Sequence, residues 1–407
     1  MKMIKMGILG LGARGYSLMK DVVLPRENVQ VVAVCDLYDD RVKRAADMIH
    51  EKKEQEVFGT TDPKEFWDCE MDAVLIASSW QDHVDSCIEG MRRGIYVACE
   101  VGGTYSIHDC WKLVDCYEET KTPVMMMENC CYGQRELMIL NMVEQGVLGD
   151  IVHCEGGYLH DLRDEISEGR ERRHYRLLNY LKRNCENYPT HEIGPIARIL
   201  KINRGNRMVK LAAQASRAAG LKEYMKQKRE ADFDLLKENF AQGDIVTTTI
   251  TCAGGETIVI QLNTTLPRYY SRKFTVLGTK GMYNEDNDSI FLDDEHATEH
   301  FKWNEHYGNA EKYRDEYEHP IWKKYIEEGV RGGHDGMDWL VFSAFFEAVE
   351  AGINTPIDVY DMASWMAISC LSEESISLGG QVVYIPDFTR GAWMSEERLG
   401  LEGHKKI

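Results

Sequence analysis

The sequence predicts an α/β protein in two parts, a doubly wound parallel sheet followed by an α+β domain whose sheet is largely antiparallel. In the first part, strand and helix signals alternate and the strands are apolar throughout, as strands covered on both faces are. In the second part, the extended segments are longer, often β-branched and partly alternating. The 407 residues suffice for two cores, and we predict domains over 1–130 and 131–407.

The first domain contains four apolar segments separated by polar, amphipathic stretches that predict helices. In chain order these segments are KMGILGLG, VQVVAVCD, MDAVLIAS and GIYVACE. Their short length and apolar character favour buried strands of a parallel sheet over helices. The carboxyl ends of such strands meet at one edge of the sheet, where open α/β sheets bind their ligands.

The second domain contains four segments with strand character. They are DIVHCEGGYLH, DIVTTTITCAG, ETIVIQLNTTL and RKFTVLGT, and AGGE predicts a hairpin turn between the second and the third. Helices are expected near residues 217–240, 336–352 and 359–377. The stretch 284–319 is rich in acidic residues and carries four histidines, which predicts a solvated loop region.

Composition excludes several classes of partner. A formal charge of −19 without a compact basic cluster would repel nucleic acid and anionic lipid headgroups, so neither is an expected partner. The chain has no apolar run of about eighteen residues, and its start, MKMIKMGILG, leads directly into a strand rather than a cleavage site. We therefore expect a soluble, cytoplasmic protein. Its 12 cysteines form no CxxC pair and are expected to be reduced and mostly buried.

A glycine motif follows the first strand. Gly10, Gly12 and Gly15 have the GxGxxG spacing, and Asp36 ends the next strand. In a Rossmann domain the three glycines serve the tight turn, the approach of a pyrophosphate and close helix packing, while the acid binds the ribose hydroxyls. This context predicts NAD as the cofactor, with an empty domain as the alternative. Arg41 is the one feature that favours NADP.

Two further polar segments follow the third and fourth strands, SSWQDH at 78–83 and CEVGG at 99–103. Here the sequence resembles the sugar oxidoreductases that include glucose-fructose oxidoreductases and inositol dehydrogenases. In that family the fourth strand is usually followed by Glu-Lys-Pro, whose lysine assists proton removal. This chain has Glu100-Val101-Gly102 instead, so the lysine of a simple dehydrogenase is missing.

A narrower resemblance covers nearly the whole chain. It rests on GLGARG, ENCCYGQRELMILNMVEQGVLGDIVHCEGGYLHDLR, NYPTHEIGP, INRG, YYSRKFTVLGTKG and TPIDVYDMASWMAISCLSEESISLGGQVVYIPDFTRG. Together these segments resemble glycoside hydrolase family 109, NAD-dependent α-N-acetylgalactosaminidases that also carry valine in place of that lysine. The resemblance implies the fold, a tightly held NAD and cleavage of a glycosidic bond.

Such enzymes escape the usual need for two carboxylates at the anomeric carbon. Transient oxidation at C3 acidifies the C2 proton, a base removes it, the C1 substituent leaves, water adds and the hydride returns. The resemblance implies as sugar-site residues Tyr158, Arg176, Tyr188, His191 and Tyr270, with His160 and Glu128 nearby. On the cofactor it implies Arg14, Gly15, Asp36, Trp80, His83, Glu100, Val101 and Asn129, beside Gly10 and Gly12.

We assign the O3 proton to His191 and the C2 proton to Tyr158 or Tyr188, because histidine and tyrosine supply groups of differing basicity. Pattern alone also allows a packing tyrosine and a capping or core histidine at these positions. His296 and His300 in HATEH do not have the order of a zinc protease motif, and no metal is expected. His334 in GGHDGMD stands between glycines that would let it project into a cleft.

Three functions remain open at this point. The first is an NAD-dependent glycosidase acting on N-acetylgalactosamine or a related hexose. The second is a sugar dehydrogenase or 3-keto-sugar oxidoreductase, which the valine at 101 disfavours. The third is a noncatalytic NAD-responsive binding protein, which would need no paired acid-base groups. The expected partners are a small carbohydrate and further copies of the same chain in a homo-oligomer.

Overall fold

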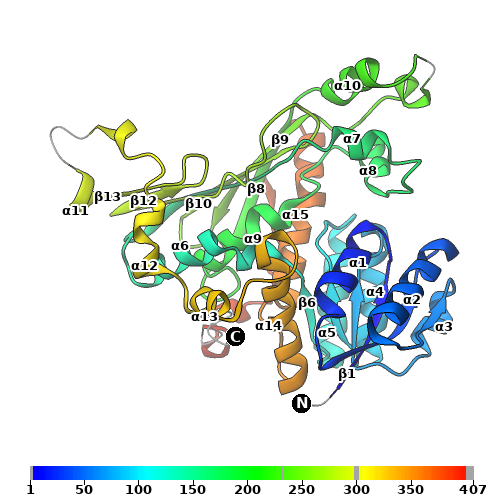
Figure 1. The fold of residues 1–407 in the computed structure, drawn as a ribbon. Coiled ribbons are helices and arrows are strands. Elements are labelled where there is room, and N and C mark those ends of the chain that lie inside the picture. Colours follow the sequence, from blue (N-terminus) through cyan, green and yellow to red (C-terminus); the bar gives the residue numbers. More distant parts are fainter. Residues whose placement is uncertain (1–2, 232, 298–301, 400–407) are drawn as a thin grey trace. The chain divides into compact units, whose positions relative to one another are not determined.

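The structure, a computed structural model, describes residues 3–231, 233–297 and 302–399 (Figure 1). The described residues form two compact units, the first from 3–132 and 324–363 and the second from 133–323 and 364–399. Residues 324–363 thus cluster with the first unit, although the sequence-based division at residue 130 places them in the second domain. The division at residue 130 stays a prediction of a cofactor domain and a substrate domain. The two units, by contrast, group residues that pack together.

The first unit contains a parallel sheet with the strand order β3-β2-β1-β4-β5-β6, the order of a Rossmann fold. Its strands are β1 (Ile4–Leu9), β2 (Val29–Cys35), β3 (Phe58–Thr60), β4 (Ala73–Ile76), β5 (Tyr96–Cys99) and β6 (Val124–Met126). The predicted fold class is confirmed. The two strands that the sequence did not indicate, β3 and β6, have three residues each, too few for a periodic pattern.

Two helices of the first unit begin at a side-chain cap. Asp62 accepts a hydrogen bond from the backbone N–H of Lys64, and Ser106 accepts one from that of Asp109. The helices are α1 (Ala13–Leu18), α2 (Asp39–Lys53), α3 (Pro63–Trp67), α4 (Trp80–Arg92), α5 (Ile107–Thr120) and α14 (Met337–Ala351). Helix α14 packs against the short 3-10 helix Asn129–Tyr132, which brings the late segment 337–351 into this unit.

The second unit contains an eight-stranded sheet with the order β13-β12-β11-β7-β10-β9-β8-β14. The strands are β7 (Ile151–Leu159), β8 (Met208–Ala215), β9 (Ile245–Cys252), β10 (Thr257–Asn263), β11 (Thr275–Gly278), β12 (Gly281–Asn284), β13 (Ser289–Leu292) and β14 (Val383–Tyr384). All recorded pairs are antiparallel except β7 with β10. The largely antiparallel sheet and the β9–β10 hairpin at AGGE are therefore confirmed.

Helix α9 (Pro189–Ile199) lies directly on strand β7. A Cβ at Gly156 would stand 2.3 Å from the carbonyl oxygen of Glu192, so only glycine permits this close contact of helix and strand. Pro189 occupies the first helical position, where its missing N–H costs nothing. This contact holds the first turn of α9 beside the end of the strand that carries Tyr158.

The remaining helices complete the two units. They are α6 (Gln134–Glu144), α7 (Arg163–Ser167), α8 (Arg176–Lys182), α10 (Gly220–Lys228), α11 (Asp293–His296), α12 (Arg314–Tyr317), α13 (Pro320–Glu328), α15 (Val359–Ser377) and α16 (Glu396–Leu399). Helices α14 and α15 agree with the predicted ranges, whereas α10 covers only part of 217–240. Within the described ranges, no helix is both long and apolar enough to cross a membrane. All 12 cysteines lie in the described ranges, where none is part of a disulfide, and ten of them are buried.

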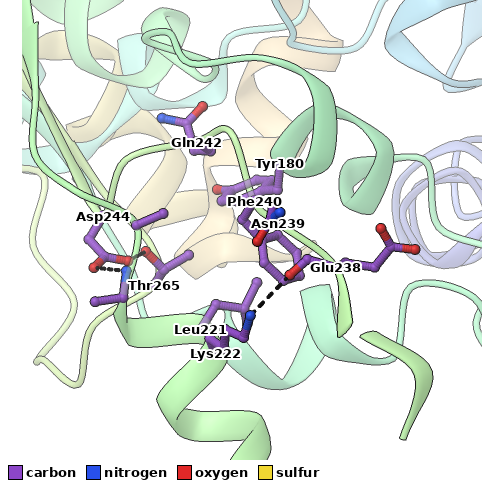
Figure 2. Close-up of a pocket in the computed structure, with 11 residues that line it drawn as sticks. Tyr180, Leu221, Lys222, Glu238, Asn239, Phe240, Gln242, Asp244 and Thr265 are labelled. Atoms are coloured by element: carbon purple, nitrogen blue, oxygen red, sulfur yellow. Dashed lines mark hydrogen bonds between the residues drawn. The ribbon is translucent and has the colours of Figure 1, made fainter. Parts of the chain in front are cut away.

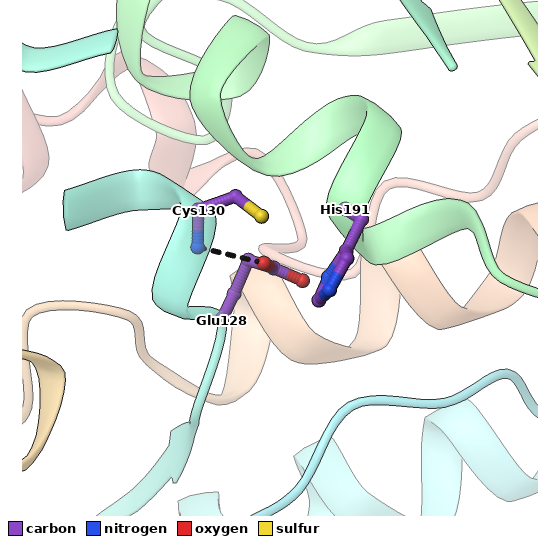
Figure 3. Close-up of side chains that lie close together, drawn as sticks. All are labelled: Glu128, Cys130 and His191. Atoms are coloured by element: carbon purple, nitrogen blue, oxygen red, sulfur yellow. Dashed lines mark hydrogen bonds between the residues drawn. The ribbon is translucent and has the colours of Figure 1, made fainter. Parts of the chain in front are cut away.

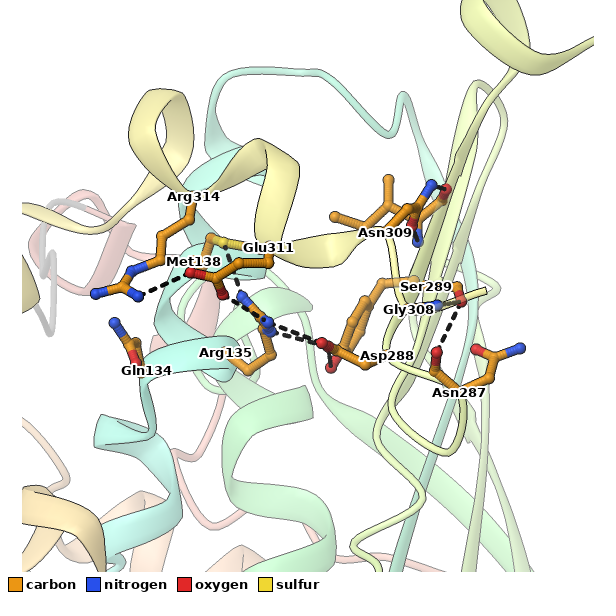
Figure 4. Close-up of polar contacts among 12 residues, drawn as sticks. Gln134, Arg135, Met138, Asn287, Asp288, Ser289, Gly308, Asn309, Glu311 and Arg314 are labelled. Atoms are coloured by element: carbon orange, nitrogen blue, oxygen red, sulfur yellow. Dashed lines mark hydrogen bonds and ion pairs between the residues drawn. The ribbon is translucent and has the colours of Figure 1, made fainter. Parts of the chain in front are cut away.

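The prediction of a solvated loop region over 284–319 is wrong for part of that stretch. It contains β13, α11 and α12, and both His296 and His319 are buried. Asn309 helps to fix this stretch against β13. Its side-chain oxygen accepts a hydrogen bond from the backbone N–H of Ile290 at 2.7 Å, and its amide nitrogen donates one to the carbonyl of Ile290 at 2.9 Å. Figure 4 shows the ion pairs of Arg135 with Asp288 at 2.8 Å and Glu311 at 3.2 Å. His300 lies outside the described residues.

Candidate functional site

The turn after β1 requires glycine at two of its three motif positions. Gly10 has φ +96°, and a Cβ there would lie 2.4 Å from backbone atoms of Ala77 and Ser78. A Cβ at Gly15 would lie 2.0 Å from the carbonyl oxygen of Gly10. At Gly12, by contrast, the nearest atom is 3.7 Å away, on Arg41. The protein itself leaves room at Gly12, as a backbone that receives a pyrophosphate must.

Asp36 lies at the end of β2, buried beside this turn. Its carboxylate accepts hydrogen bonds from the backbone N–H groups of Leu11 at 2.7 Å and Tyr38 at 3.1 Å. Arg41 contacts the same carboxylate at 3.4 Å. The one cation that the sequence offered for a 2′-phosphate is thus already paired with the acid that would repel that phosphate.

Trp80 and His83 occupy the first turn of α4 and are both buried. A Cβ at Gly102 would lie 2.6 Å from the Trp80 ring, so the glycine after Val101 lets the indole pack against this backbone. His83 is only 1 % exposed, and its Nε2 is 3.2 Å from the carbonyl oxygen of Ser78. Burial lowers the pKa of His83, but contacts with Cys99, Ser78 and Asp82 outweigh it and raise the pKa.

Arg14 stands between two carboxylates. Its guanidinium contacts Glu100 at 3.2 Å and Asp338 at 2.8 Å, and Asn129 donates to the same Asp338 at 2.8 Å. Burial pushes the pKa of Asp338 upward, but Arg14 and His334 outweigh it and hold that pKa well below its usual range. Three residues named from the sequence, Arg14, Asn129 and His334, therefore contact Asp338, which the sequence did not indicate. No local pattern indicated this residue, because His334 lies on the loop before α14 and Asp338 on the helix itself.

His334 lies on a loop with unusual backbone geometry. Its φ is +50° and that of Asp335 is +53°, in the left-handed region that non-glycine residues rarely adopt. The Nδ1 atom of His334 is 2.8 Å from Asp338 and 3.2 Å from Arg14. The expectation that the surrounding glycines let this histidine project agrees with its exposed side chain.

Glu128 and Val101 are also buried in the first unit. Figure 3 shows Glu128 accepting a hydrogen bond from the backbone N–H of Cys130 at 3.0 Å, within the turn that follows β6. Residues predicted for the cofactor, together with Glu128, all belong to this unit. The other residues predicted for the sugar belong to the second unit.

In the second unit the predicted tyrosines and histidines form one cluster. The rings of Tyr158 on β7 and Tyr188 at the start of α9 stack with centroids 4.2 Å apart. His191, one turn into α9, meets both rings edge-on at 5.5 and 4.8 Å. His160 accepts or donates at 3.3 Å to the Tyr158 hydroxyl, and its ring is 5.1 Å from that of Tyr270. Tyr270 is 52 % exposed and marks the open side of the cluster.

Arg176 adds a buried positive charge to this cluster. Its guanidinium carbon is 5.1 Å from the centroid of the Tyr188 ring, and its Nε is 3.0 Å from Glu165. Burial lowers the pKa of His160, and the Arg176 charge lowers it further. His160 is therefore neutral near neutral pH, and its unprotonated ring nitrogen can accept a hydrogen bond.

Three acidic residues of this region escaped the sequence analysis. Glu165 pairs with Arg176, while Glu186 and Glu192 stand on either side of the YPTH segment and are fully buried. Burial raises the pKa of both Glu186 and Glu192. Their position in ENYPTHE was visible, but nothing in the pattern indicated that both carboxyls turn inward.

A small cavity of about 190 Å³ lies between α8, α10 and the segment 238–244. Figure 2 shows its lining, which includes Tyr180, Lys222, Glu238 and Asp244. Asp244 is occupied by hydrogen bonds from Ala219, Gly220 and Thr265, so it caps α10 rather than facing a ligand.

Two family models match the chain. Residues 132–395 match the model described as "Glycosyl hydrolase 109, C-terminal domain", and residues 4–128 match "Oxidoreductase family, NAD-binding Rossmann fold". A "Glycosyl hydrolase family 109 protein" of Stenotrophomonas maltophilia is 39 % identical over 97 % of this chain and 91 % of the relative. An "Alpha-N-acetylgalactosaminidase" of Shewanella oneidensis is 34 % identical over 99 % of this chain and 89 % of the relative.

Among solved structures, the myo-inositol 2-dehydrogenase of Lactobacillus plantarum superposes with a TM-score of 0.66 at 15 % identity, covering 95 % of this chain and all of that one. An inositol dehydrogenase homologue from Azotobacter vinelandii, complexed with NAD+, superposes with a TM-score of 0.65 at 13 % identity, covering 94 % and 97 %. At these identities the likeness concerns the fold.

Proposed function

The chain belongs to glycosyl hydrolase family 109, and on that premise we propose that it is an NAD-dependent glycosidase acting on N-acetylgalactosamine or a related hexose. The names of the relatives support the sugar, and the matched Rossmann model supports the cofactor. The observation that carries the proposal is the cluster of Tyr158, Tyr188 and His191 beside Arg176. These residues are proton-transfer groups of another kind than the paired carboxylates of ordinary glycosidases.

In the proposed reaction, bound NAD+ supplies a reversible acceptor for the hydride from C3 of the sugar. His191 takes the O3 proton during that oxidation and gives it back at the end. Tyr158 or Tyr188 removes the C2 proton once C3 is a ketone, and the C1 substituent then leaves. Water adds its hydroxyl at C1, and its other proton goes to the oxygen of the departed group. Each proton and the hydride return to the sugar, so the sum is hydrolysis without a second substrate.

The surroundings of the tyrosines fit this role. The positive charge of Arg176 acts on both Tyr158 and Tyr188. Neutral His160 can accept the hydrogen of the Tyr158 hydroxyl at 3.3 Å. A nearby positive charge and a hydrogen-bond acceptor suit a tyrosine that gives up a proton and takes one back.

The test is the fate of the C2 hydrogen in heavy water. We expect the released sugar to carry deuterium at C2, because the base exchanges its proton with solvent before it returns one. We also expect no NADH to accumulate, and loss of activity when the cofactor is reduced beforehand, with recovery on adding NAD+. Nitrophenyl glycosides of both anomeric configurations, mass spectrometry and optical detection of NADH are sufficient.

Other outcomes separate the alternatives. Full retention of the C2 hydrogen, with no isotope effect from deuterium at C2 or C3, would rule out the redox route. NADH accumulating in proportion to product would identify a sugar dehydrogenase instead. Binding of the sugar without turnover or deuterium exchange would identify a binding protein.

We also predict a preference for NAD over NADP and retention of NAD through purification. The Asp36 carboxylate would stand near a 2′-phosphate, and Arg41 is already paired with that carboxylate. Calorimetry with the cofactor-free protein should give tighter binding of NAD, and Asp36→Ser should narrow the difference. Tighter binding of NADP by the unmodified protein would contradict this prediction.

A further inference from the structure

Glu186 and Glu192 form a carboxyl pair inside the second unit. Their exposed fractions are 0 % and 1 %, and the two carboxyl groups lie close enough to act on one another. Taken as carboxylates, their four oxygens are buried without a hydrogen-bond partner in the described part of the chain. Two carboxylates only accept hydrogen bonds, so their contact becomes a bond only when one of them is protonated.

The pair is fixed on three sides. The backbone N–H of Glu186 donates to Ser372 at 2.9 Å and its carbonyl accepts from Ser369 at 2.7 Å, both on α15. The carboxyl of Glu186 also interacts with the backbone of Tyr188 and Leu262. The carboxyl of Glu192 interacts with the backbone of Tyr158 and Gln261, on the neighbouring strands β7 and β10.

No compensating cation is among the groups that act on the pair in the described residues. Those groups are the two carboxyls themselves and backbone groups of β7, β10 and the start of α9. The packed elements carry further ionisable side chains, which are His191 and Arg198 on α9, His153, Cys154, Glu155 and Tyr158 on β7, Tyr360, Asp361, Cys370, Glu373 and Glu374 on α15, and Tyr188 before α9. None of these side chains is among the groups that act on the pair, and Glu373 is paired with Arg183 at 2.6 Å. Two adjacent buried negative charges without a counter-ion are costly enough that at least one carboxyl holds its proton.

We propose that Glu186 and Glu192 share a buried proton and act as positioning residues for Tyr188 and His191. Glu186 precedes Tyr188 by two residues and Glu192 directly follows His191, so the two glutamates lie at either end of the YPTH segment. Their contact holds α9 against β7, the strand of Tyr158. Loss of the shared proton places two charges side by side and forces α9 away from β7, which moves His191 and Tyr188 relative to Tyr158.

The first experiment measures stability and does not depend on the proposed function. Because burial raises the pKa of both carboxyls, the folded protein binds more protons than the unfolded chain above the ordinary carboxyl pKa of about 4.5. Stability contributed by the pair is therefore lost as pH rises. The melting temperature of the wild type should therefore fall between about pH 5 and about pH 9. We expect the melting temperatures of Glu186→Gln and Glu192→Gln to fall less over the same range.

The control for this experiment is Glu223→Gln, an exposed carboxylate on α10 that should leave the slope unchanged. Equal slopes in the wild type and both Gln variants would overturn the shared proton. Should the variants fail to fold, infrared spectra of the wild type and of Glu285→Gln decide, since Glu285 is the other carboxyl in the described part of this unit whose pKa is raised. The carbonyl band of a protonated carboxyl must persist in both near neutral pH; its absence overturns the proposal.

The positioning role, which rests on the proposed function, is tested by the pH dependence of kcat. Glutamine keeps the shape and hydrogen-bonding of a protonated carboxyl, so both Gln variants should turn over within about twofold of the wild type near pH 6 and keep their activity to higher pH. An unchanged alkaline limb in both would overturn the positioning role. If no protein hydrolyses any glycoside, the proposed function fails while the melting and infrared results still stand.

Discussion

Tyr188→Phe and His191→Ala are expected to lower kcat by about a hundredfold or more while leaving the fold and bound NAD intact. Phenylalanine retains the ring that stacks on Tyr158 at 4.2 Å, so the first change removes only a hydroxyl. His191 contacts the two tyrosines edge-on and is only partly buried, so its loss removes a proton carrier more than it removes packing. Turnover, melting temperature and NAD content measured on each protein would check this.

Two control substitutions test whether the loss of any tyrosine or histidine of this unit would lower kcat. Tyr283→Phe removes a buried hydroxyl that contacts Asp288 at 3.2 Å, and His153→Ala removes a histidine of β7 that contacts Thr257 at 2.7 Å. Both should keep kcat near that of the wild type. A His191→Ala protein with normal turnover and normal melting would return His191 to a structural role.

The glycines of the turn after β1 are expected to separate folding from cofactor binding. Gly15→Ala would place a Cβ 2.0 Å from the Gly10 carbonyl oxygen, and the resulting overpacking should lower the free energy of unfolding by about 1–3 kcal/mol or more. Gly12→Ala meets nothing closer than 3.7 Å, so its melting without NAD should be close to that of the wild type. Its Cβ would stand where the pyrophosphate approaches the backbone, and NAD affinity should fall at least about tenfold.

Melting curves of the cofactor-free proteins and calorimetry with NAD distinguish the two effects. The expected pattern is a destabilised Gly15→Ala protein and a stable Gly12→Ala protein that binds NAD poorly. Normal NAD affinity in Gly12→Ala would show that the cofactor does not approach this turn. Normal stability in Gly15→Ala would contradict the close packing of α1 on the strand.

Local rules explain why the first unit was predictable. Apolar runs ending in glycine or acid, at spacings set by a strand and the next helix, identified β1, β2, β4 and β5 together with Gly10, Gly15 and Asp36. The same rules identified the β9–β10 hairpin and the helix Val359–Ser377. Strand period, helix period and turn residues act over a few positions, so one sequence is enough to recognise them.

The sequence by itself determined the fold class, the glycine turn and the presence of tyrosines and histidines suited to proton transfer. Only the tertiary structure decided which of their surroundings matter: Asp338 reaches Arg14 across more than three hundred residues, and Glu186 and Glu192 turn inward with no cation beside them among the described residues. Side-chain pairing and burial depend on where distant segments meet after folding, and pKa values follow burial and nearby charge. No local pattern carries that information.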